Sequence, residues 1–101
     1  MKTILALMLP AMLGQSIAEE HGEFGKRRMA AGWTYRDKVR SCAIDLKRTN
    51  ESCAGARSNS RDRACRMQAW DNYEACRDTA RARYHRELTR LAAAEDRLPA
   101  D

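Results

Sequence analysis

The four cysteines are the residues of this sequence whose chemistry is most specific. They are Cys42, Cys53, Cys65 and Cys76, so ten residues separate the first two, eleven the middle two and ten the last two. Four cysteines can bind a zinc ion or form two disulfides. Zinc sites need close pairs such as C-x2-C, and no two cysteines here are closer than eleven positions. The spacing therefore predicts two disulfides and no metal site.

Helix geometry selects one of the three possible pairings. Eleven residues make about three turns of an α-helix, so Cys42 and Cys53 share a face but lie about 16 Å apart, too far for a bridge. The same holds for Cys65 and Cys76. In an antiparallel hairpin that turns at residue 59, each outer cysteine lies opposite the other outer one, because both pairs are symmetric about that position. We therefore expect an outer bridge, Cys42–Cys76, and an inner bridge, Cys53–Cys65.

Apolar and small residues extend this pattern in steps of three and four, as in a coiled coil. The first helix is expected over about 34–54, with Thr34 as its N-cap and Gly55 ending it in a left-handed turn. The second is expected over about 60–98 and is ended by Pro99. The predicted seam consists of Tyr35, Val39, Cys42, Leu46, Thr49 and Cys53, then Cys65, Ala69, Tyr73, Cys76, Ala80, Tyr84, Leu88, Leu91 and Leu98. The predicted fold class is all-α, a disulfide-stapled antiparallel helical hairpin.

The first 18 residues have the pattern of a secretory signal peptide: one lysine, an apolar run, and small residues ending at Ala18. The apolar run of about ten residues is too short to span a bilayer, which takes roughly 20. Together with two disulfides, this predicts an exported protein, periplasmic or secreted, with no membrane span after cleavage.

Residues 19–32, EEHGEFGKRRMAAG, have three glycines and no periodicity. We expect them to form a flexible arm in front of the hairpin domain, residues 33–101.

Composition narrows the function classes. Arginine supplies 15 of the 19 basic residues and alanine is abundant, which is typical of GC-rich bacterial or phage genomes. Without the signal peptide, 18 basic and 14 acidic residues give a net charge of +4, and no recognition motif accompanies it, which argues against nucleic acid as a partner. His21 and His85 belong to no catalytic constellation, and bridged cysteines leave no thiol nucleophile. We therefore expect no catalytic activity and no cofactor.

The stripe around Trp70 is one candidate partner-binding surface. Four arginines share this stripe at helical offsets: Arg63, Arg66, Arg77 and Arg81. Arginine beside an exposed aromatic ring suits protein contacts and anion binding. Acidic neighbours at helical spacing predict three local ion pairs: Asp62–Arg66, Glu74–Arg77 and Asp78–Arg81. The alternative is a tryptophan packed at the helix edge and covered by arginine stems.

The C-terminal end of the second helix is the other candidate surface. Leu88, Leu91 and Leu98 lie beyond the point that the first helix is expected to reach. They could form a seam with a second copy, giving a homodimer, or with a helix of another protein. Alternatively, the arm folds back and covers them with Phe24, Met29 and Trp33, or the terminal turns fray.

Two resemblances bear on these predictions. Over residues 35–80 the chain resembles the twin C-x9-C helical hairpins of the mitochondrial intermembrane space, which also bridge outer to outer and inner to inner. The segments CAIDLKRTNESC and QAWDNYEACRDTARARYHRELTRL resemble the LprI-type family of periplasmic lysozyme inhibitors. The matching positions are Cys42, Cys53, Gln68, Trp70, Cys76, Arg83 and Leu88.

The preferred prediction is a small exported protein without catalytic activity that acts through protein–protein contacts. Inhibition of a cell-wall hydrolase, which the second resemblance implies, is the alternative.

Overall fold

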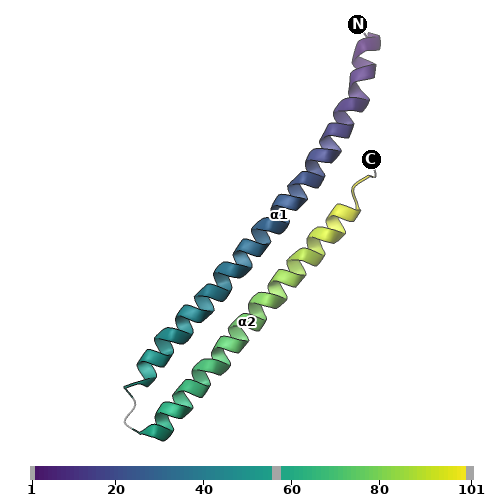
Figure 1. Cartoon of the computed structure of the whole chain (residues 1–101). Coiled ribbons are helices and arrows are strands. Elements are labelled where there is room, and N and C mark those ends of the chain that lie inside the picture. Colours follow the sequence, from purple (N-terminus) through teal and green to yellow (C-terminus); the bar gives the residue numbers. More distant parts are fainter. Residues whose placement is uncertain (1, 56–57, 100–101) are drawn as a thin grey trace. The chain divides into compact units, whose positions relative to one another are not determined.

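The structure, a computed structural model, describes residues 2–55 and 58–99, and within them the side chains from residue 19 onward. These residues form two helices, α1 (Lys2–Cys53) and α2 (Asn59–Asp96), and no strand (Figure 1). The predicted all-α helical hairpin is confirmed. Three of the four helix ends lie within two residues of their predicted positions, and the beginning of α1 is the exception.

Both predicted bridges are present. The Cα atoms are 5.9 Å apart in the outer bridge, Cys42–Cys76, and 5.6 Å apart in the inner bridge, Cys53–Cys65. The two bridges lie in one compact unit, Gly32–His85, which we call the stapled unit. Its fully buried residues, among those described, are small: Cys42, Cys53, Ala69 and Ala80. The disulfides therefore occupy the space that large aliphatic side chains fill in most helical cores.

The turn between the helices is closed by local hydrogen bonds. After α1 ends at Cys53, the Gly55 N–H donates to the Ser52 carbonyl oxygen at 3.2 Å. The left-handed conformation predicted for Gly55 is wrong, because its φ is not positive; a hydrogen bond three residues back closes the turn without it. At the start of α2, the Arg61 N–H donates to Ser58 Oγ at 3.2 Å. Ser58 thus acts as the N-cap.

The flexible arm predicted for residues 19–32 is wrong. This segment is helical and belongs to α1, which begins at Lys2 and passes through Thr34 without interruption. Its half-buried residues recur at helical spacing: His21, Phe24, Gly25, Ala31 and Gly32. Because most of them are small or polar, the segment lacks the hydrophobic periodicity that marks a helix in a sequence.

The terminal unit consists of Met1–Ala31 and Arg86–Asp101. In it, Arg28 of α1 forms an ion pair with Glu95 of α2 at 2.8 Å, and His21 Nδ1 lies 3.3 Å from the same carboxylate. The predicted signal peptide lies where only the backbone is described, so its removal stays a prediction. No helix in the described residues is long and apolar enough to cross a membrane.

Candidate functional site

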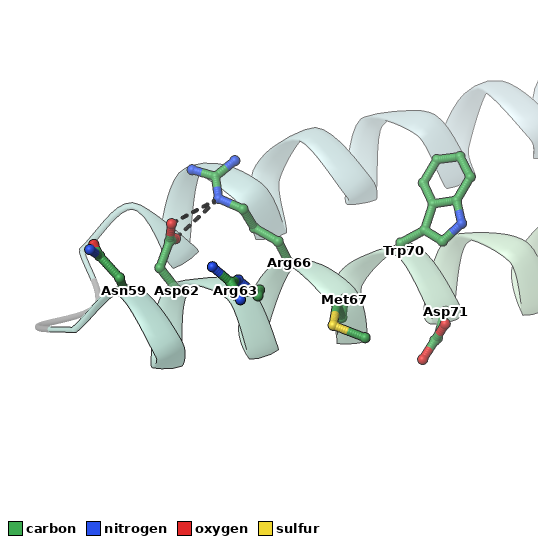
Figure 2. A pocket seen from close by; sticks show the side chains of 7 residues that line it. All are labelled: Asn59, Asp62, Arg63, Arg66, Met67, Trp70 and Asp71. Carbon is green, nitrogen blue, oxygen red and sulfur yellow. Dashed lines mark hydrogen bonds and ion pairs between the residues drawn. The ribbon is translucent and has the colours of Figure 1, made fainter.

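The stapled unit has a shallow, open groove on the first three turns of α2 (Figure 2). It has a volume of about 580 Å³. The lining residues recur every three or four positions and come from this one helix: Asn59, Asp62, Arg63, Arg66, Met67, Trp70 and Asp71. Three of them, Arg63, Arg66 and Trp70, were predicted from the sequence. Figure 2 shows Trp70 and Arg66 on one side of the groove and Met67 and Asp71 on the other.

The apolar part of this groove is accessible to solvent. Met67 is 63% exposed and Trp70 is 49% exposed. The Trp70 ring contacts the Tyr73 ring in a tilted arrangement, with ring centroids 5.3 Å apart and planes at 45°. One side of the indole is therefore packed against its own helix, and the rest remains available for contact.

The arginines around Trp70 differ in their contacts. Arg66 Nε lies 3.1 Å from a carboxylate oxygen of Asp62, as predicted, and the predicted Asp78–Arg81 pair is present at 3.9 Å. Arg77 does not pair with Glu74; its guanidinium lies over the Tyr73 ring, 5.5 Å from the centroid. The guanidinium that stacks in this part of the described chain therefore covers Tyr73 and not Trp70.

A second depression, of about 430 Å³, lies on α1 and was not predicted. It is lined by Ala43, Leu46, Lys47, Asn50, Glu51 and Ala54 of α1 together with Arg66 of α2. Because Arg66 lines both depressions, they are neighbours on one face of the stapled unit. The Oδ1 atom of Asn50 is buried there without a hydrogen-bond partner among the described residues. No pattern in the sequence marks this depression, since Leu46 was expected only as a seam residue and most of the other lining residues are ordinary occupants of a solvated helix face.

The leucines of the second candidate surface are not an open seam. Leu91 is 0% exposed, and Leu88 and Leu98 are half-buried. In the terminal unit, residues 19–31 of α1 lie along this end of α2, so the prediction that the N-terminal segment covers the leucines is the one that holds. It does so as a helix. Of the three residues expected to cover the leucines, Phe24 is half-buried, but Met29 is 67% exposed and Trp33, in the stapled unit, is 58% exposed, so the prediction was wrong for these two.

The carboxylate of Glu95 is the polar centre of the terminal unit. The hydrogen bond with His21, and then the hydrogen bond and charge of Arg28, lower the pKa of Glu95 below its ordinary value of 4.5. In the same unit the pKa of Glu87 is lowered, mainly by its hydrogen bond from Arg90. Both carboxylates therefore carry a negative charge at neutral pH, and the contacts of Glu95 with His21 and Arg28 hold α1 against α2 at this end.

Trp33 and Ile44 form a further exposed apolar pair on α1 of the stapled unit, 58% and 45% exposed. They are eleven residues apart and so share a face of the helix. The guanidinium of Arg36 lies 5.2 Å from the Trp33 ring centroid and shields it in part. Neither residue lines either depression, so this face is a weaker candidate than the groove at Trp70.

Titratable residues in the described part of the chain form no group of three or more that could hold a metal ion. All four cysteines are in disulfides. His21 is engaged with Glu95, and the His85 ring lies beside the Tyr84 ring, with centroids 6.0 Å apart. What the arrangement offers chemically is an apolar surface edged by guanidinium and carboxylate groups.

No protein-family model matches the chain, and no curated protein or solved structure is significantly similar to it.

Proposed function

We propose that this protein is a small exported binding module without catalytic activity, and that it contacts another polypeptide through the groove at Trp70. The observation that carries this proposal is the exposure of Met67 and Trp70 on the two sides of one groove in the stapled unit. Only about half of each side chain is still exposed, so covering the remainder contributes about 1–2 kcal/mol each. Tryptophan and arginine are also the residue types that most often dominate protein interfaces.

The scaffold supports the same function. Both bridges lie in the unit that carries the groove, so the helices cannot separate and the groove keeps its shape before a partner arrives. A preformed surface loses little conformational entropy on binding. The disulfides also indicate an oxidising compartment, which agrees with export by the predicted signal peptide.

Site-specific crosslinking tests the proposal. A photoreactive amino acid replaces Asp71, which lines the groove, and in the control it replaces Thr79, which is exposed on the side of α2 opposite Trp70 and lines neither depression. We expect position 71 to give one crosslinked product of defined mass in the native compartment and position 79 to give none. Trp70→Ala should remove that product. Identical products from both positions, or a product that survives Trp70→Ala, would contradict the proposal.

A further inference from the structure

The stripe of α2 that passes through the groove at Trp70 and continues one turn beyond it is complementary to itself. Arg63, Met67 and Trp70 line the groove, and Glu74 lies just past its lining residues on α2. Arg63 precedes Met67 by four residues, Trp70 follows Met67 by three, and Glu74 follows Trp70 by four. These steps of four, three and four place all four side chains on one stripe of α2. Read in one direction the stripe is cation, apolar, apolar, anion. Read in the other, the spacing is the same and the charges are reversed.

The two charged groups at the ends of this stripe are available. Arg63 and Glu74 are both exposed, and neither forms an ion pair with any residue that the structure describes. Glu74 was expected to pair with Arg77, but that guanidinium lies over Tyr73. Asp62, which precedes Arg63 in the sequence and also lines the groove, forms an ion pair with Arg66 at 3.1 Å.

We infer that the occupant of the groove is a second copy of this chain, with α2 packed antiparallel against α2 of the other copy. A two-fold axis that passes between Met67 and Trp70 brings Met67 against Trp70 of the second copy and Arg63 against Glu74 of the second copy. Each contact occurs twice, because the interface is the same patch on both copies. This inference rests on the proposed function of the groove as a polypeptide-binding surface, and it names the partner.

The chemistry of each contact fits. A thioether beside an aromatic ring is a favourable pair, and both apolar side chains are exposed, one on each side of the groove (Figure 2). Arg63 and Glu74 then close the two ends of the apolar centre. A parallel arrangement would place Arg63 beside Arg63 and Glu74 beside Glu74, so the charges specify the antiparallel one.

Charge reversal tests this geometry. Arg63→Glu places a second carboxylate opposite Glu74 of the other copy, and Glu74→Arg makes two guanidinium groups face each other, so each variant alone should weaken dimerisation at least about tenfold. The double variant Arg63→Glu/Glu74→Arg restores the pairs and should dimerise like the natural chain. An equimolar mixture of the two single variants should form a heterodimer, because every facing pair in it is again opposite in charge.

Sedimentation equilibrium of the oxidised protein provides the measurement, with moderate salt to screen long-range repulsion between copies. Arg83→Glu is the matched control, since it makes the same charge change at an exposed position that lines neither depression. Far-ultraviolet circular dichroism verifies that each variant is helical.

A chain that stays monomeric up to about 1 mM would overturn the inference. So would single variants that dimerise as the control does, or a mixture that does not associate. These outcomes are separate from a failure of the proposed function: a position-71 crosslink to a different protein, lost in Trp70→Ala, would leave that function standing while the second copy is ruled out as partner.

Discussion

Leu91→Ala should destabilise the terminal unit by about 2–3 kcal/mol. Leu91 is the one large aliphatic side chain that is fully buried among the described residues. The substitution removes three carbon atoms, and at about 0.8 kcal/mol per buried methylene the transfer contribution alone is about 2.4 kcal/mol. A residual cavity adds to this value, although neighbouring side chains near the helix ends can partly close it.

Native-state hydrogen exchange is the suitable assay, because it reports the stability of each segment separately. A loss of about 2.4 kcal/mol corresponds to exchange that is roughly 60-fold faster, which we expect for amides in 86–96 and 19–31. The stapled unit should keep its protection, since both bridges lie there. Leu88→Ala, at a half-buried position, is the matched control and should produce a smaller effect.

One result would refute this reasoning. If Leu91→Ala left exchange in the terminal unit unchanged but reduced self-association, the leucine would serve an interface between molecules instead of the core of one. The covering of α2 by residues 19–31 would then not be the arrangement in solution.

Three further predictions concern the bridges, the ion pairs and the alternative function. Replacing both cysteines of the outer bridge by alanine should lower the free energy of unfolding by about 3 kcal/mol in guanidinium titrations. With the inner bridge intact, the outer bridge closes a loop of roughly 22 residues, and the loss of that loop closure sets this value. Because the pKa of Glu95 is lowered, the Glu95 carboxylate stabilises the folded state fully above pH 4.5, and this stabilisation is lost as the pH falls below that value. The Glu95→Gln variant should therefore lose less stability than the natural chain between pH 7 and pH 3. The lowered pKa of Glu87 should account for part of the stability that the variant still loses. In a lysozyme clearing assay we expect no slowing by excess protein, since a basic chain and a basic enzyme repel, and clear inhibition would favour the hydrolase-inhibitor alternative.

The cysteine positions made the stapled unit predictable. Helix geometry forbids a bridge between cysteines eleven residues apart, and the symmetry about residue 59 then leaves one antiparallel register, which the structure has. The N-cap at Ser58 agrees with residue 59 as the centre of that symmetry, and serine is a common N-cap. In both cases the constraint is local or covalent, so the sequence alone contains it.

The N-terminal part of α1 was not predictable in the same way. Gly25, which is half-buried, has a low helix propensity that favours a loop, and the contacts with α2 come from His21 and Arg28, which are polar residue types typical of a solvated surface. The two polar residues are placed by contacts with Glu95, about seventy positions away in the chain. A pattern within 14 residues cannot report such contacts. The contact of Arg77 was also not predictable from spacing. Tyr73 and Glu74 both precede Arg77 by one helical turn, and the guanidinium lies over the Tyr73 ring.

The distribution of charge and burial explains why the candidate site lies in the stapled unit. Residues 32–85 contain twelve basic and seven acidic residues, a difference of +5, while the rest of the chain has seven of each. The whole formal charge of +5 thus falls on the unit whose fully buried residues are cysteine and alanine. Large apolar side chains are not needed for its core, because covalent bridges constrain the unfolded chain in their place. Met67 and Trp70 can therefore remain on the surface, and reduction of the bridges should abolish binding at the groove by releasing the helix that presents them.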